Sequence, residues 1–163
     1  MKKVFLLIIC ILLIQRINGQ AVNISHSDMT YFNDTISYEL SDKIPDGIYK
    51  IYVDKALTIL DCTGEIKNQK KENTWTWFFE DGVKKHEITY QAGIYDGPEK
   101  YYYPNGQKSL TITFTKGKQN GLTIGWYLKG DKMFEGAYLD GNASGVWNFY
   151  NEDGTLFSKE EKQ

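Results

Sequence analysis

The chain has 163 residues and a formal net charge of −2, and 15% of its residues are aromatic. This length suits one domain, and a slightly acidic chain without a basic patch argues against binding to nucleic acid or to anionic membrane surfaces. Many aromatic residues together with frequent Gly favour strands and turns over helices.

Residues 1–21 have the features of a secretory signal peptide. Lys2 and Lys3 precede an apolar run that ends at Ile14, and the small-residue site Gly19-Gln20-Ala21 follows. The run is shorter than the roughly 20 apolar residues that a spanning helix needs. Cys10 lies inside the run, which argues against a lipoprotein. We therefore expect an exported protein that is periplasmic, secreted or at the cell surface.

Cleavage of this segment would lower the formal charge from −2 to −5. It would also leave Cys62 as the single cysteine, which excludes an intrachain disulfide in the mature chain. Cys62 could then be a buried small hydrophobic residue, an intermolecular partner or a reactive thiol.

The segment before the regular array has two parts. Residues 22–46 have no clear period, and apolar residues between Tyr31 and Leu40 predict a short strand that caps the first edge of a sheet. Residues 47–72 look like a degenerate repeat, with strands in IYKIYVD and ALTILDC and a turn at Thr63-Gly64.

Residues 73–157 contain four repeats with a period of about 24 residues, the last of them partial. Three glycine-rich columns mark the period: Asn73, Gly97, Gly121 and Gly145; Gly82, Gly106, Gly130 and Gly154; and Gly93, Gly117 and Gly141. Pairs such as Asp81-Gly82 and Asn105-Gly106 between apolar runs predict two-residue type I′ hairpins. Residues 158–163 form a charged tail, which discourages pairing at an exposed edge.

Each repeat therefore has two strands and two reversals of the chain. In the second strand, apolar and polar residues alternate, as in Leu110, Ile112 and Phe114 against Thr111 and Thr113. The first strand is aromatic on both faces in places. The sequence thus predicts an all-β fold, an antiparallel β-hairpin meander that forms a curved, solenoid-like single sheet.

Blocks of the form Gly–x4–aromatic–x3–Gly, with a second Gly near the end, resemble MORN-type repeats, in particular the bacterial variant found in exported proteins. The resemblance covers residues 73–157 well and residues 47–70 weakly. It implies a β-hairpin array that serves as an interaction platform without catalytic machinery. Some bacterial members carry an antitoxin label, but a signal peptide is at odds with a cytoplasmic antitoxin. Asn73 and Gly125 depart from the family pattern.

The residues that carry chemistry are few. His86 falls on the apolar face of its strand, which indicates a partly buried core residue. No His or Cys cluster has metal-binding spacing, and no nucleophile, zinc or phosphate-loop motif is present. We expect a protein that is not an enzyme, with no metal, no cofactor and no catalytic residue.

The aromatic residues allow one sharper hypothesis. An aromatic strip on successive first strands would suit a protein or a glycan if it is exposed, and would be core if the sheet covers it. We therefore expect a protein partner, with carbohydrate or cell wall as the alternative and membrane binding disfavoured. The strip consists of Trp75, Trp77, Tyr101, Tyr103, Tyr127, Trp147 and Phe149.

Overall fold

The computed structural model describes residues 21–25, 46–54 and 56–163. Nearly all of the predicted signal peptide lies outside the described residues. The strand predicted between Tyr31 and Leu40 lies outside them as well. Within the described ranges the chain is all-β and contains no helix.

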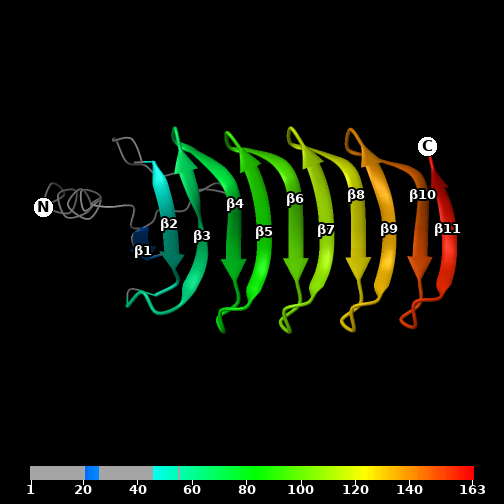
Figure 1. Cartoon of the computed structure of the whole chain (residues 1–163), viewed down its shortest axis with the longest axis horizontal. Coiled ribbons are helices and arrows are strands. Elements are labelled where there is room, and N and C mark those ends of the chain that lie inside the picture. Colours follow the sequence, from blue (N-terminus) through cyan, green and yellow to red (C-terminus); the bar gives the residue numbers. More distant parts are fainter. Residues whose placement is uncertain (1–20, 26–45, 55) are drawn as a thin grey trace, which may run out of the picture.

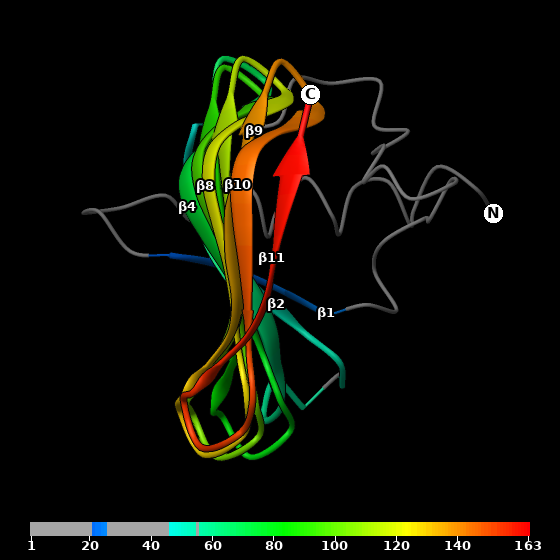
Figure 2. The same ribbon diagram turned by 90° about the vertical axis from the view of Figure 1, so that its right-hand side faces the viewer.

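In the part of the chain that the structure describes, eleven strands form one open, uncurled sheet, and the spatial order of the strands is their order in the chain (Figure 1). Strands β2 to β11 pair antiparallel, which confirms the predicted meander, whereas β1 pairs parallel with β2. Seen edge-on, the strands lie in a single layer (Figure 2). The strands are β1 Val22–Ser25, β2 Gly47–Tyr52, β3 Leu60–Lys67, β4 Lys70–Phe78, β5 Lys84–Gln91, β6 Ile94–Tyr102, β7 Lys108–Thr115, β8 Lys118–Trp126, β9 Lys132–Leu139, β10 Asn142–Tyr150 and β11 Leu156–Lys162.

The repeats have the same period in space as in sequence. Strands β4, β6, β8 and β10 begin at Lys70, Ile94, Lys118 and Asn142, so their spacing equals the length of one repeat. We call one side of the sheet the aromatic face, which carries Trp75, Ile88 and Tyr101. The other side, which carries Thr74 and Thr89, is the threonine face.

The two ends of each repeat use different turns, and the predicted type I′ turn at the Asp-Gly and Asn-Gly pairs is wrong. There, Gly106 has a φ of 84° but Asn105 does not have a positive φ, and the Gly106 N–H donates to the Tyr103 carbonyl at 2.8 Å. This is a three-residue loop, a type I turn followed by a left-handed glycine.

Two-residue turns with positive φ at both positions occur at the opposite end of the hairpins. Lys116 and Gly117 have φ values of 50° and 82°, as type I′ turns require. The Gly117 N–H also donates to the carbonyl of Tyr95, in the strand that begins its own repeat, at 2.8 Å. Gly93 and Gly141 donate in the same way, to Lys71 and Gln119, so each of these turns is bonded to the corresponding turn region of the preceding hairpin.

The turn predicted at Thr63-Gly64 is also wrong. Strand β3 runs through both residues, and the turn follows at Asn68 and Gln69, which have positive φ. Gly64 is needed for packing: a Cβ there would lie 2.1 Å from Cδ2 of Trp75. The indole therefore occupies the space above a residue that has no side chain.

Strand β11 ends the array with polar residues. Residues 158–162, predicted as a charged tail, pair with β10 as part of β11. Its Ser158 and Glu160 pair with Phe149 and Trp147, so the aromatic face ends in polar side chains at this edge. Charged side chains on an edge strand oppose the addition of another strand.

The best-buried residues lie at the N-terminal end of the array. Trp75 is 0% exposed, and Cys62 is 2% exposed beside it on the aromatic face. The remaining members of this core come from β2 to β5 and are Tyr49, Ile51, Ile66, Ile88 and Tyr90.

Gly136 repeats the arrangement of Gly64, because a Cβ there would lie 2.1 Å from Cδ2 of Trp147. We expect Gly136→Ala to lower the free energy of unfolding by about 1–3 kcal/mol, the usual cost of overpacking. Denaturant unfolding measures this change. Gly141→Ala is the control for backbone strain, because this turn glycine has open space around it and a Cβ there meets no neighbour. Trp147→Leu in the Gly136→Ala background should recover part of the lost stability. Changes in unfolding free energy that simply add in the double variant would contradict a contact between residue 136 and the indole of Trp147.

Candidate functional site

The predicted aromatic strip is not one continuous exposed surface. Trp75 and Trp147, on its first and last strands, are buried, at 0% and 7% exposure. The other five members are half-buried: Trp77, Tyr101, Tyr103, Tyr127 and Phe149. The two buried indoles belong to the packing of the sheet, and only the half-buried rings could contact a ligand.

Two groups of ring contacts on the aromatic face contain members of the predicted strip. The first is a chain of contacts in which Trp77 lies 5.3 Å from His86, and His86 stacks on Tyr101 at 4.1 Å between ring centroids. In the second, Phe134 lies 6.0 Å from Trp147 and 6.4 Å from Phe149. Strand β8 lies between the two groups and has Thr123 and Gly125 on this face.

Gly125 has a packing role that its departure from the family pattern did not reveal. A Cβ on Gly125 would lie 2.4 Å from Cε1 of Phe134. The Phe134 ring therefore covers the backbone at the position where other repeats have a large side chain. Gly125 therefore leaves room for the Phe134 ring, which covers β8 on the aromatic face.

Tyr103 and Tyr127 have a structural task. The Tyr103 hydroxyl donates to the carbonyl of Trp126 at 2.7 Å, and the Tyr127 hydroxyl donates to the carbonyl of Tyr150 at 2.8 Å. Each bond joins one three-residue loop to the next repeat. Phe79 occupies the same column and has no hydroxyl with which to make this bond.

A buried carboxylate, which the sequence did not single out, lies beside the first group of rings. Glu99 is 6% exposed; its Oε1 lies 2.9 Å from Nε2 of His86 and accepts a hydrogen bond from the Tyr101 hydroxyl at 3.0 Å. Burial, together with the bond to Glu99, raises the pKa of Tyr101 to about 12. His86, expected in the core, is thus partnered by a carboxylate from β6.

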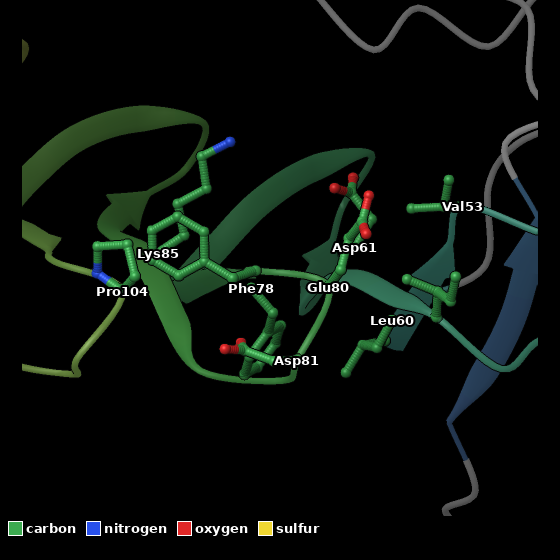
Figure 3. Close-up of a pocket in the computed structure, with 10 residues that line it drawn as sticks. Val53, Leu60, Asp61, Phe78, Glu80, Asp81, Lys85 and Pro104 are labelled. Carbon is green, nitrogen blue, oxygen red and sulfur yellow. The ribbon is translucent and has the colours of Figure 1, made fainter.

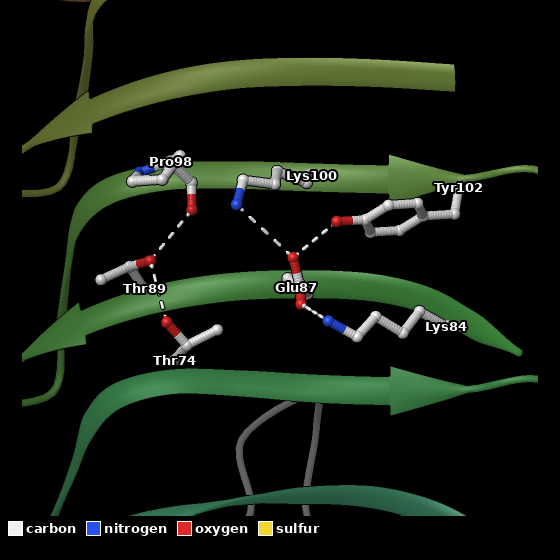
Figure 4. Close-up of polar contacts among 7 residues, drawn as sticks. All are labelled: Thr74, Lys84, Glu87, Thr89, Pro98, Lys100 and Tyr102. Carbon is white, nitrogen blue, oxygen red and sulfur yellow. Dashed lines mark hydrogen bonds and ion pairs between the residues drawn. The ribbon is translucent and has the colours of Figure 1, made fainter. Parts of the chain in front are cut away.

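The opposite face carries a second buried carboxylate, at one of the polar positions of the alternating pattern. Glu87 is 7% exposed and accepts hydrogen bonds of 2.6 Å from Lys84 and from the Tyr102 hydroxyl (Figure 4). Lys100 lies 3.6 Å away. Burial raises the pKa of Glu87, but the bonds from Lys84 and Tyr102 and the nearby positive charges outweigh it, so the pKa falls below its usual range.

The same cluster recurs two repeats further along the chain. Glu135 accepts bonds of 2.6 Å from Lys132 and Tyr150, which lowers its pKa. The repeat between has Thr111 at this position, so the cluster alternates along the array. These carboxylates are saturated by neighbouring donors, which suits the joining of adjacent hairpins.

A pocket opens at the loop end of the hairpins, between the β2–β3 connection and the β4–β5 loop (Figure 3). Its walls include Leu60, Phe78 and Phe79, and its charged residues are Asp61, Glu80, Asp81 and Lys85. Asp54 orders the connection by accepting hydrogen bonds from the backbone N–H groups of Thr58 and Ile59 at 3.0 and 2.9 Å. These bonds lower the pKa of Asp54.

Cys62 and Lys71 are held within the core. Burial raises the pKa of the Cys62 thiol to about 12, which leaves the thiolate nucleophile scarce at neutral pH. The Lys71 ammonium lies 4.6 Å from the Trp75 ring centroid and 5.2 Å from those of Trp77 and Tyr90. Burial lowers the pKa of Lys71.

The described ranges contain no group of three or more His, Cys, Asp or Glu residues that could hold a metal ion. They also contain no helix of the length and apolarity that membrane crossing requires.

Substitution of Glu87 should change how stability depends on pH. Because its pKa is lower in the folded chain than its ordinary 4.5, Glu87 stabilises the fold above that value, and the contribution is lost as the pH falls through the folded pKa. We expect Glu87→Gln to cost about 1.5–3 kcal/mol at pH 7, the range for hydrogen bonds to charged groups. The variant should also lose less stability than the wild type on acidification.

Chemical denaturation at several pH values between 3 and 7 would measure both effects. Glu152→Gln, at an exposed loop carboxylate, is the matched control and should follow the wild type. A Glu87→Gln curve parallel to the wild-type curve would contradict this role for Glu87.

One comparison with known proteins agrees with the repeat geometry. A family model described as a MORN repeat variant matches residues 71–92 and 95–116. These ranges are offset by one repeat and coincide with the β4–β5 and β6–β7 hairpins. A comparison with curated proteins found no match.

Among solved structures, the chain is similar to one described as the crystal structure of accessory secretory protein 1, 2 and 3 in Streptococcus pneumoniae. The two are 15% identical with a TM-score of 0.38, and the match covers 87% of this chain. It covers 24% of that chain, so this protein spans less than a quarter of its length. The family match, in contrast, coincides with two hairpins of the meander. Residues 71–92 and 95–116 thus match MORN repeats of the variant type.

Proposed function

We propose that this is an exported, non-enzymatic repeat protein that uses its β-sheet as a platform for a protein partner. The support for export is the sequence of residues 1–21, with its basic start, apolar run and small-residue site. The support for a platform is the single-layer sheet, in which no second layer formed by the described residues covers either face of the repeat array (Figure 2).

The observation that carries the proposal is an apolar patch on the threonine face. Leu122 and Val146 occupy the same position of successive repeats and are 51% and 49% exposed. Ile124 and Trp126 lie half-buried beside them on β8. We call Leu122, Ile124, Trp126 and Val146 the apolar patch. Strand β9 lies between Leu122 and Val146, with Ala137 paired to Leu122 and Glu135 paired to Ile124. Exposed apolar side chains on one part of a sheet are typical of a surface that another protein covers.

Polar residues on the first repeat of the threonine face favour the apolar patch as the contact surface. On β4 and β5 this face carries Thr74, Thr76 and Thr89, together with Glu87 and its hydrogen-bonding partners. The Thr113 hydroxyl donates to the carbonyl of Leu122 at 2.9 Å, so the polar part of the face borders the apolar patch. An apolar centre with a polar border is the usual composition of a protein interface.

Loss of the patch should abolish capture of the partner. We expect Leu122→Ser/Val146→Ser to remain folded, because both side chains are already half in solvent, and to lose a protein that the wild type captures from the envelope or culture fluid of the native host. Affinity capture with quantitative mass spectrometry measures this. Leu139→Ser, at a 60% exposed position next to a type I′ turn, is the control. An identical captured set for the wild type and the double variant would contradict the proposal.

A second candidate function is binding of carbohydrate or cell wall. The observation in its favour is the row of half-buried rings of Trp77, His86 and Tyr101 beside the Glu99 carboxylate, because aromatic faces next to polar groups suit sugar rings.

Under this alternative, the wild type should bind glycans on an array or sediment with peptidoglycan, and Trp77→Ala should lose that binding. Tyr138→Ala removes a half-buried ring elsewhere on the same face and serves as the control. Absence of glycan binding by the wild type, or equal binding by both variants, would count against the alternative.

A further inference from the structure

We propose that the pocket between the β2–β3 connection and the β4–β5 loop binds an arginine side chain of a partner protein. This inference deepens the proposed function, on which it rests, by naming the chemistry of one contact. It concerns a different surface from the apolar patch, since the pocket lies at the loop end of the hairpins (Figure 3).

The walls of the pocket suit the aliphatic stem and flat head of arginine. Ile59 and Leu60 supply aliphatic surface, and Phe78 and Phe79 supply two rings. The Phe79 ring already has a cation near it, because the Lys85 ammonium lies 5.9 Å from its centroid. A guanidinium is planar and weakly hydrated, and it stacks on aromatic faces more readily than an ammonium does.

The charge of the pocket favours a cation. Three carboxylates, those of Asp61, Glu80 and Asp81, border it together with one ammonium, that of Lys85. Figure 3 shows the carboxylates of Asp61 and Glu80 close together on the upper side of the pocket, where the Lys85 ammonium also lies, and the Asp81 carboxylate on the lower side. Carboxylates on one side match the forked N–H groups of a guanidinium.

The break in the repeat explains why the pocket forms here. Elsewhere in the array the corresponding loop residues, Tyr103 and Tyr127, are bonded to the next repeat through their hydroxyls. Phe79 has no hydroxyl, and its loop lies next to the irregular β2–β3 connection, where residues 53–59 replace a short hairpin loop. The hydrogen bonds from the backbone N–H groups of Thr58 and Ile59 to Asp54 fix the end of this connection that borders the pocket.

The chain offers an internal control for this site. Residues 151–154 have the same loop chemistry as residues 79–82, including a Glu-Asp-Gly sequence. Asp81 and Asp153 accept the same loop bond, from the N–H of Val83 at 3.0 Å and of Thr155 at 2.9 Å. The last loop lacks the phenyl ring and is not part of the pocket.

The test is titration of the full chain with Nα-acetyl-arginine amide, followed by amide chemical shifts in heteronuclear NMR. We expect saturable shifts at residues 59–61 and 79–82, and no comparable shifts at residues 151–154. The uncharged analogue Nα-acetyl-citrulline amide should produce at least tenfold weaker shifts at the same concentration. Equal shifts with the two probes, or equal shifts at the two loops, would overturn the proposal.

Two matched variants test the contribution of the carboxylates. Glu80→Gln/Asp81→Asn keeps the loop acceptor and should weaken binding of the arginine probe at least threefold. Glu152→Gln/Asp153→Asn should leave the binding constant unchanged. Equal affinity of the wild type and the Glu80→Gln/Asp81→Asn variant would contradict an electrostatic role for the pocket.

These outcomes are separable from a failure of the platform proposal. Probe binding at the pocket without partner capture through the apolar patch would support an arginine site on a protein whose platform role is wrong. Partner capture that depends on Leu122 and Val146, without probe binding, would support the platform and reject the arginine site.

Discussion

The hydrogen bonds between successive hairpins are the constraint on which the rest of the structure depends. At one end of the hairpins the turn glycines, such as Gly117, donate to a carbonyl beside the preceding turn. At the other end Tyr103 and Tyr127 donate to carbonyls of the following repeat. A single-layer sheet has no opposing layer to set its register, so these two rows of bonds, together with the strand ladders, align one repeat with the next.

Within that frame, each column of the repeat is filled in more than one way. The position of Trp75 is occupied by Glu99, Thr123 and Trp147 in the following repeats. Neighbouring residues accommodate each of the large side chains. A glycine lies beneath each indole, and His86 and Tyr101 form hydrogen bonds with Glu99. The consequence is a sheet whose period is regular in the backbone and variable in its chemistry. Function therefore depends on which repeat presents which side chain.

The same variation separates packing residues from candidate contact residues. Most polar clusters are closed within the sheet, as Glu87 and Glu135 are by lysine and tyrosine donors. Among the described residues, the apolar patch around Leu122 and Val146 and the pocket beside Phe79 are two surfaces that could accept a partner. The apolar patch arises where the last two repeats differ from the first two, and the pocket arises where the array meets the irregular β2–β3 connection. The functional proposals rest on these departures because a purely regular array would present the same surface at every repeat.

The sequence by itself determined the repeat length, the alternation of faces and the antiparallel meander, because glycine spacing and a period of two are local properties of the chain. Only the tertiary structure decided which turn type closes each end of the hairpins. The sequences at Asn105-Gly106 and Lys116-Gly117 are both compatible with a two-residue hairpin turn, but strand pairing gives Lys116 a positive φ and does not give one to Asn105. It also decided that Gly64 lies within a strand, because the reason is the indole of Trp75 from the next strand. Likewise, the burial of Glu87 and Glu99, and of two of the seven strip residues, depends on neighbours from other strands.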